Sequence, residues 1–238
     1  MEGEKERKQQ EMKVTFTGHS GFFVEMENMY FLFDYYNGSI PQMDDEKPLA
    51  VFVSHSHDDH YSRRIWDIQK YHSQTVYVLS YDVRAGKRDN VLSLRPGVKE
   101  KIDIFGISFT VETFVSTDEG VSFYVGHEGN TLYHAGDLNI WAWYEEGTDY
   151  VNEQRELFKE ATLPLDGRYV DAAFILLDPR LGEGGFEGMD AYRKLLDARS
   201  IFPMHQWGRY DFTEDYIMKR EDTDNIRIIT HEGQEFEI

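Results

Sequence analysis

Short apolar runs separated by turn residues dominate the first third of the chain and predict β-strands. The expected strand segments are KVTFT at 13–17, GFFVEM at 21–26, MYFLFD at 29–34, LAVFVS at 49–54 and TVYVLS at 75–80. The letters GHS between the first two segments predict a tight turn. The spacing of Ile65 and Ile68 predicts a helix over 62–72. This part of the chain therefore predicts several strands with one helix among them.

Farther along the chain the pattern changes to hairpins and then to helices. Apolar residues alternate on either side of Phe105-Gly106 and of Glu128-Gly129-Asn130, which predicts two hairpins. The remaining expected elements are helices at 150–163 and 189–199, strands at 171–177 and 200–204, and a last hairpin around Glu232-Gly233. The glycine-rich segment 182–188 is expected to be a flexible loop. Two groups of strands with helices between them predict an α/β fold of two face-to-face sheets with helices outside.

Composition supports one folded domain. Apolar residues make up 40% of the chain and aromatic residues 15%, which is enough for a core. The start is charged and has no apolar signal segment, so residues 1–12 are expected to be a mobile arm and 13–238 a single domain. The longest apolar runs, such as AAFILL at 172–177, are too short to cross a membrane.

Charge and cysteine usage narrow the choice of partners. The chain carries 25 Lys and Arg against 44 Asp and Glu, a net charge of −19, and has no long basic stretch. Binding to nucleic acid or to an anionic membrane needs clustered cations, so we expect neither. A small-molecule substrate is expected instead, and a local basic pocket would suit an anionic one. With no cysteine, any metal must be bound by nitrogen and oxygen. A cytoplasmic location fits this composition, and the oligomeric state stays open.

Three histidines and two aspartates are concentrated in VFVSHSHDDHY, residues 51–61. His55 and His57 are two positions apart and project to the same side of an extended segment. Asp59 and His60 follow where the chain turns toward the expected helix. Imidazole nitrogen and carboxylate oxygen are ligands for zinc, manganese or iron. The alternative is a solvated polar loop, but this spacing directly after a buried strand favours a metal site.

The letters HSHDDH match the H-x-H-x-D-H motif, and on these residues the chain resembles the metallo-β-lactamase superfamily. The resemblance implies a four-layer αββα sandwich with a metal site at one edge of the paired sheets. It also implies two further ligands, Asp137 at the end of LYHAGD and His205 in SIFPMHQWG. Asp137 would be shared between two ions. One or two divalent ions are therefore the expected cofactor.

Three further segments resemble the branch of this superfamily that contains L-ascorbate 6-phosphate lactonase: TGHSGFFVE, STDEGVSF, and GGFEGMDAYRKLL followed by FPMH. The branch implies a hydrolase in which metal-activated water attacks an ester, lactone or phosphoester. Asp59 is the expected catalytic residue, orienting that water or accepting its proton. One alternative is a di-iron redox enzyme on the same fold, against which His57 argues because that branch has Glu there. Another is a non-catalytic metal-binding protein.

One ligand that the resemblance implies is missing. Family members with two metals place a third histidine of the first site after the strand that ends here in VETF, where this chain has VSTDEG. Asp118 is the nearest replacement. If it turns inward, it completes a first site with His55 and His57. If it caps the turn, that site stays incomplete.

Four other residues carry two interpretations each. His19 is either a partner of the metal ligands or a turn histidine. Asp178 either orients a ligand histidine or caps the next turn. Arg180 either anchors an anionic substrate or forms a surface ion pair. Trp207 either walls a substrate pocket or packs in the ordinary way.

Overall fold

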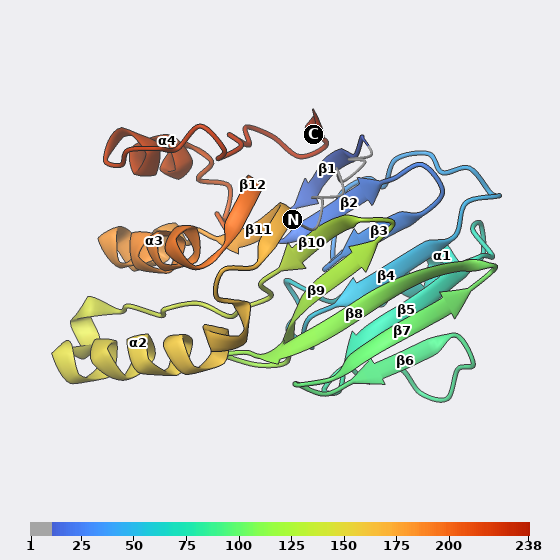
Figure 1. The fold of residues 1–238 in the computed structure, drawn as a ribbon, viewed down its shortest axis with the longest axis horizontal. Helices are drawn as coiled ribbons and strands as arrows, with labels where there is room; N and C mark the ends of the chain where they lie inside the picture. Colours follow the sequence, from blue (N-terminus) through green and yellow to red (C-terminus); the bar gives the residue numbers. More distant parts are fainter. Residues whose placement is uncertain (1–10) are drawn as a thin grey trace, which may run out of the picture.

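The computed structural model describes residues 11–238, which form two β-sheets with helices outside them (Figure 1). The first sheet has the strand order β13-β1-β2-β3-β4-β5-β6 and the second β12-β11-β10-β9-β8-β7. The strands of the first sheet are β1 (Lys13–Gly18), β2 (Gly21–Glu25), β3 (Tyr30–Phe33), β4 (Leu49–Val53), β5 (Thr75–Ser80), β6 (Val91–Leu94) and β13 (Glu235–Glu237). Those of the second are β7 (Lys99–Ile104), β8 (Ile107–Val115), β9 (Val121–His127), β10 (Asn130–His134), β11 (Tyr169–Leu176) and β12 (Asp197–Met204).

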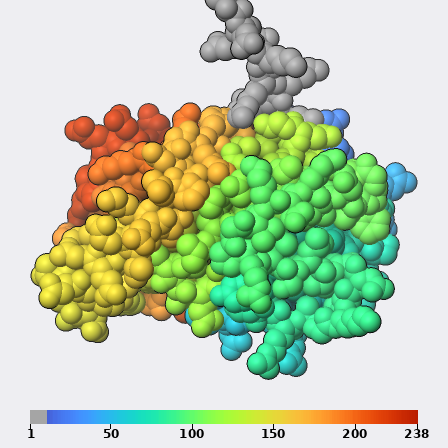
Figure 2. Space-filling model, turned by 60° about the horizontal axis from the view of Figure 1, so that its bottom comes forward, coloured from blue at the N-terminus to red at the C-terminus, as the bar shows by residue number. Residues whose placement is uncertain are grey.

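The helices complete a four-layer arrangement. They are α1 (Ile65–Ile68), α2 (Thr148–Thr162), α3 (Gly185–Leu195) and α4 (Asp211–Met218), with short 3-10 helices η1 (Tyr144–Glu146), η2 (Leu163–Leu165) and η3 (Pro179–Gly184). In Figure 1, α2, α3 and α4 gather beside β10, β11 and β12. In the space-filling view of Figure 2, the yellow segment that contains α2 adjoins the green strands of the second sheet. The predicted αββα sandwich is confirmed.

Aromatic side chains fill the space between the sheets. Phe22 of β2 stacks on Phe174 of β11 with ring centroids 4.3 Å apart, and Phe52 of β4 meets Phe123 of β9 at 5.1 Å. A second apolar cluster covers the other face of the first sheet and includes Ile65 of α1. Because both faces of this sheet are covered, its central strands are continuous apolar runs. This is why the early strands were visible in the sequence.

Two predicted helices differ in extent from those in the structure. The helix expected over 62–72 shrinks to α1, because the N–H groups of Ile65 and Trp66 bond to carbonyls only three residues back, as in tight turns. The helix expected over 189–199 instead occupies Gly185–Leu195, so the prediction of a flexible loop at 182–188 is wrong. A Cβ at Gly185 would lie 2.4 Å from the carbonyl oxygen of Asp178. Glycine here serves the close approach of α3 to the end of β11.

The last predicted hairpin is also wrong, because its two halves join different sheets. Ile226 forms a bridge to Ile201 of the second sheet, whereas β13 pairs with β1 of the first. The N–H of Gly233 donates to the carbonyl of Phe16 at 2.7 Å. The backbone at the predicted hairpin turn is thus bonded to β1. The last segments pair with strands that are distant in sequence, and a local pattern of apolar residues cannot predict such pairing.

The two ends of the described chain lie close together. The N–H of Met12 donates to the carbonyl of Ile238 at 3.0 Å, and Met12 is buried. Residues 1–10 of the predicted arm lie outside the described residues. Within residues 11–238, no helix has both the length and the apolar character needed to cross a bilayer.

One edge of the sandwich collects the strand ends that carry polar residues. Strands β3 and β4 run parallel, as do β10, β11 and β12, so their carboxyl ends emerge at the same edge of each sheet. The N–H of Val121 donates to the carbonyl of Ser54 at 2.9 Å, and the N–H of His205 donates to that of His19 at 3.1 Å. These two bonds join the sheets directly beside the histidine motif.

Candidate metal centre

The chain after β4 turns sharply, which brings the histidines of the motif together. The N–H groups of His60 and Tyr61 both donate to the carbonyl of His57, at 3.0 and 2.9 Å. The rings of His55 and His60 consequently lie 4.1 Å apart, and both residues are fully buried. The side chain of His57 is 44% exposed. The motif therefore spans from the interior to the surface.

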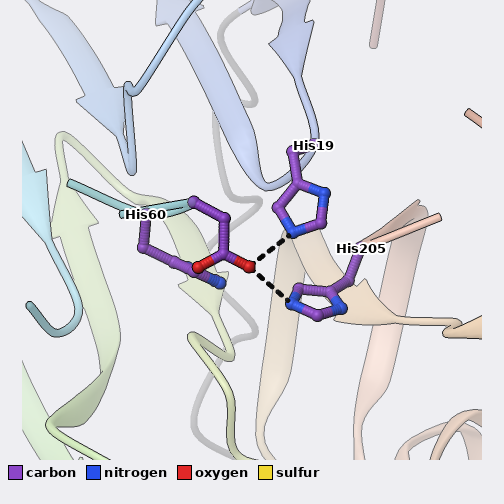
Figure 3. Close-up of side chains that lie close together, drawn as sticks. His19, His60 and His205 are labelled. Carbon is purple, nitrogen blue, oxygen red and sulfur yellow. Dashed lines mark ion pairs between the residues drawn. The ribbon is translucent and has the colours of Figure 1, made fainter. Parts of the chain in front are cut away.

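Eight side chains at this edge form two groups of potential metal ligands. The enclosed group consists of His19, Asp59, His60 and His205, and the open group of His55, His57, Asp118 and Asp137. Within each group, one ligand atom from every residue lies within 4.8 Å of the others. In Figure 3, the rings of His19 and His205 converge on one carboxylate oxygen, which is Oδ2 of Asp59, and His60 lies beside them. The Nε2 atoms of His19 and His205 lie 3.3 and 3.6 Å from Oδ2 of Asp59.

Several of these atoms are buried without a hydrogen-bond partner in the described structure. They are Nε2 of His19, His60 and His205 and Oδ1 of Asp137. Each such atom costs about 1–3 kcal/mol if nothing satisfies it. Their nearest charged neighbours stand 3.1–3.6 Å away, and ligands of a tetrahedral zinc ion about 2.0 Å from the metal stand about 3.3 Å apart. The residues present therefore fit a divalent ion.

Asp137 lies between the two groups. Its Oδ1 is 3.1 Å from Nε2 of His60 and 3.6 Å from Nε2 of His205, whereas its Oδ2 is 3.5 Å from Nε2 of His55. Burial alone would raise the pKa of this carboxyl, but His60 and His205 outweigh burial and lower it well below its usual range. An ionised carboxylate with one oxygen toward each group has the geometry needed to bridge two ions.

A layer of hydrogen bonds behind the groups fixes which nitrogen of each histidine faces inward. His60 donates from Nδ1 to Oδ2 of Asp34 at 2.7 Å, and His205 donates from Nδ1 to Oδ2 of Asp178 at 3.0 Å. The hydroxyl of Ser54 donates to Asp34 at 2.6 Å and lies 2.9 Å from Nδ1 of His55, from which it accepts. Because Nδ1 of each ring is held by these bonds, Nε2 is the nitrogen that faces the groups.

Protonation of the metal-free groups follows from the same contacts. Burial opposes charge on His60, but Asp137 and Asp34 outweigh burial and raise its pKa well above the usual value. Burial and, to a smaller extent, the neighbouring His60 together lower the pKa of His55 to about 4. At neutral pH the metal-free protein therefore holds a charged His60 against Asp137 and a neutral His55. His60 would have to lose its Nε2 proton to serve as a ligand in the enclosed group.

Asp118 turns toward the open group. Its Oδ2 lies 3.9 Å from Nδ1 of His57, and the turn is capped by Ser116, whose hydroxyl accepts from the N–H of Asp118 at 3.1 Å. Burial raises the pKa of Asp118, and the charge of Asp137 raises it further. The carboxylate thus lies among the potential ligands of the open group, at its exposed end.

Asp118→Ala is expected to weaken metal binding to the open group at least about tenfold, equivalent to roughly 1.4 kcal/mol of binding free energy. The enclosed group should keep its ion, because Asp118 is not among its potential ligands. Titration of metal-free protein with zinc and manganese measures both affinity and stoichiometry. Asp58→Ala is the matched control, since Asp58 is an exposed neighbour outside both groups. Unchanged stoichiometry and affinity in Asp118→Ala would remove this residue from the ligand set.

The structure brings the other predicted residues to the same edge. His19 lies in the enclosed group of potential ligands. Asp178 makes the contacts that both suggested roles require, since it accepts from His205 and also from the N–H of Arg180 at 2.8 Å. Arg180 forms an ion pair with Asp178 at 2.6 Å. The ring of Trp207 lies 4.6 Å from that of His19.

Asp34 is a buried residue behind the ligand groups that the sequence analysis missed. It is 1% exposed and accepts hydrogen bonds from Ser54 and His60. A signal was present, because Asp34 ends the apolar run MYFLFD and an aspartate after a buried strand needs a partner. The partner became clear only from the parallel pairing of β3 with β4.

Comparisons with known proteins agree with this architecture. The sequence model of the β-lactamase superfamily domain matches residues 13–141, more than half of the 238 residues. A UPF0173 metal-dependent hydrolase of Nanoarchaeum equitans is 27% identical over 209 residues, covering 82% of this chain and 83% of that protein. The fold is similar to that of Igni18, a metallo hydrolase from Ignicoccus hospitalis, with a TM-score of 0.62, 15% identity, and coverage of 96% and 98%. YhfI of Bacillus subtilis, a metallo-β-lactamase fold protein, gives a TM-score of 0.56 at 14% identity, with coverage of 96% and 100%. The chain belongs to the β-lactamase superfamily.

Proposed function

We propose that this protein is a metal-dependent hydrolase of small-molecule esters, lactones or phosphoesters. The observation that carries the proposal is the pair of ligand groups joined by Asp137, with unsatisfied buried atoms facing inward. Relatives such as the protein from Nanoarchaeum equitans are named metal-dependent hydrolases, which supports the same class. A cavity of about 370 Å³ opens beside both groups, and a volume of this order suits a small molecule.

The chain supplies two different environments for divalent ions. His19, Asp59, His60 and His205 would hold one ion in the enclosed group, where three imidazoles suit zinc. The other ion would be held in the open group by His55, His57 and Asp118, and Asp137 would be shared between the two ions. The carboxylate of Asp118 favours manganese or iron in the open group. When bound, such ions lower the pKa of a water molecule they carry and polarise the oxygen of the scissile group.

Asp59 connects the ligand groups to the cavity. It lines the cavity wall, and its side chain is 27% exposed. Burial raises the pKa of its carboxyl, but the imidazoles of His19 and His205 beside it, at 3.3 and 3.6 Å, outweigh burial and hold the pKa far below the usual range. Because Asp59 belongs to the enclosed group and also lines the cavity, we assign it to ligation and to orienting the attacking water or accepting its proton.

A substrate panel tests the reaction class. We expect the metal-loaded protein to hydrolyse a phosphorylated sugar lactone or a phosphoester with kcat/KM at least about tenfold above that for a β-lactam, a difference of roughly 1.4 kcal/mol in transition-state stabilisation. This expected order of substrates follows from the resemblance to the branch that contains L-ascorbate 6-phosphate lactonase. Initial rates with 4-nitrophenyl acetate, bis-4-nitrophenyl phosphate, a sugar lactone and its phosphorylated form, and a chromogenic β-lactam measure it.

Two outcomes would contradict the proposal. Efficient turnover of the β-lactam alone would overturn the expected substrate class. Metal binding in both groups without hydrolysis of any member of the panel would favour the non-catalytic metal-binding alternative. The di-iron redox alternative would require oxygen consumption by the iron-loaded protein, which an oxygen electrode detects.

A further inference from the structure

The cavity beside the ligand groups has aromatic walls and a single strongly basic side chain. Trp141, Trp143, Tyr150 and Trp207 line it together with Gln154, Thr117 and residues of both groups. Arg180 is the one Lys or Arg among the residues that line it. The chain has a net charge of −19, so a fixed cation at the cavity wall stands out and would favour an anionic ligand there.

The guanidinium of Arg180 is held in one orientation. Its Nε and Nη2 atoms donate to Asp178 Oδ2 at 2.9 and 2.6 Å. Its central carbon lies 4.5 Å from the ring centroid of Trp207 and 5.9 Å from that of Trp143. The aromatic rings and Asp178 fix the plane of the group at little cost in flexibility when a ligand binds.

One edge of this guanidinium remains open. Within the described structure, Nη1 of Arg180 makes no hydrogen bond to protein, and the side chain is 43% exposed. The free edge presents N–H groups in the fork that matches a carboxylate or phosphate. A further polar atom is unsatisfied in the same cavity, since Oε1 of Gln154 is buried without a hydrogen-bond partner.

We propose that Arg180 anchors the substrate by an anionic group, a carboxylate or a phosphate, that lies apart from the bond to be cleaved. The role of Arg180 in the reaction rests on the proposed hydrolase function, whereas the binding of an anion by Arg180 does not. The tryptophan rings would cover the body of the ligand, and Gln154 would bond to one of its hydroxyl groups. A neutral substrate leaves the open edge of Arg180 unpaired, so the anionic substrate is preferred.

Asp178 links this anchor to the ligand groups. The same carboxylate oxygen that accepts from Arg180 Nη2 at 2.6 Å accepts from Nδ1 of His205 at 3.0 Å. Loss of Arg180 could therefore disturb His205 as well as the anion. The experiment must separate binding of the anion from positioning of His205.

Two matched esters make that separation. Mono-4-nitrophenyl succinate carries a carboxylate at the far end of its acyl chain, whereas 4-nitrophenyl butyrate carries a methyl group there. We expect Arg180→Gln to lower the ratio of kcat/KM for the succinate over the butyrate ester at least tenfold, and Arg180→Lys to restore part of it. Damage to His205 lowers both rates and cancels in the ratio. Arg209→Gln is the control, because Arg209 pairs with Asp211 at 3.0 Å, also two residues away, and does not line the cavity.

A binding measurement removes the dependence on hydrolysis. Acetate and methylphosphonate, which the protein cannot hydrolyse, are titrated into metal-free protein, where no ion competes for them. Tryptophan fluorescence reports binding because Trp143 and Trp207 flank Arg180. We expect at least one anion to bind, at least tenfold more weakly to Arg180→Gln, and with unchanged affinity to Arg209→Gln. The tighter of the two probes identifies the anionic group.

Three results decide the proposal. If neither anion binds the metal-free protein, or if Arg180→Gln binds them as the wild type does, the anchor is wrong. If Arg180→Gln lowers both ester rates equally and leaves anion binding intact, Arg180 only positions Asp178 and His205. If neither ester is hydrolysed but the anion binds through Arg180, the hydrolase proposal fails on these substrates and the anchor stands.

Discussion

Removal of bound metal by a chelator is expected to abolish hydrolysis while the sandwich stays folded. The activation of water and the polarisation of the scissile oxygen are together worth several kcal/mol, so kcat/KM should fall on the order of 10³-fold or more. Asp59→Asn is expected to have a comparable effect, because an amide is a weaker ligand and lacks the charge that faces His19 and His205. Initial rates with the best substrate of the panel, before and after addition of metal, measure both effects.

The fold should survive because its core is separate from the ligand groups. Aromatic residues between the sheets, such as Phe22, Phe52 and Phe174, make no contribution to either group. Circular dichroism of the chelated protein and of Asp59→Asn checks this, with Asp58→Asn as the control for an adjacent charge change. Activity that persists in protein shown to be metal-free by elemental analysis would refute the mechanism. Full activity in Asp59→Asn would remove this residue from it.

The sequence was sufficient for the fold class because its signals are local. The early strands are continuous apolar runs, and the hairpins around Phe105-Gly106 and Glu128-Gly129-Asn130 formed where alternation predicted them. The chain end failed because NIRIIT and QEFEI look like hairpin partners, yet β13 pairs with β1, more than two hundred residues away. Local alternation specifies a strand but not its partner.

The residues of the candidate site also divide into those that local sequence could predict and those that only the tertiary structure brings together. Residues 55–60 are neighbours in sequence, so their clustering followed from a strand end and a turn. His19 and Asp34 needed the tertiary structure, because the positions of both depend on pairing between separate strands and sheets. The aromatic wall depends on backbone conformation as well, since His205 and Trp207 both have positive φ, 63° and 53°. Such residues are uncommon outside glycine, and no pattern in QWG indicated them.

Asp34 offers the sharpest test of how the hydrogen bonds behind the ligands control metal binding. Oδ1 accepts from the N–H of Ser54 at 2.7 Å, and Oδ2 accepts from the Ser54 hydroxyl at 2.6 Å and from Nδ1 of His60 at 2.7 Å. An amide cannot reproduce this set. If its NH₂ faces His60, that imidazole must carry its proton on Nε2, where it blocks a metal ion. If its NH₂ faces Ser54, a buried backbone N–H loses its acceptor.

Asp34→Asn is therefore expected to weaken metal binding to the enclosed group by about 10–100-fold, the usual effect of losing a partner that orients a histidine ligand. It should also lower the free energy of unfolding by about 1–3 kcal/mol, because a buried donor or acceptor is left unpaired. Asp171→Asn is the matched control, since Asp171 is equally buried and accepts from the N–H of Thr131 at 2.8 Å, outside both groups. We expect Asp171→Asn to lose stability but keep its metal affinity.

Burial would raise the pKa of Asp34, but His134 and His60 outweigh burial and lower it. The stability lost in Asp34→Asn should thus be largest above the ordinary pKa of an aspartate and shrink as the pH falls through the folded value. Metal titration and urea unfolding at several pH values give both quantities, and equal metal affinity in the two variants would show that Asp34 serves the fold alone.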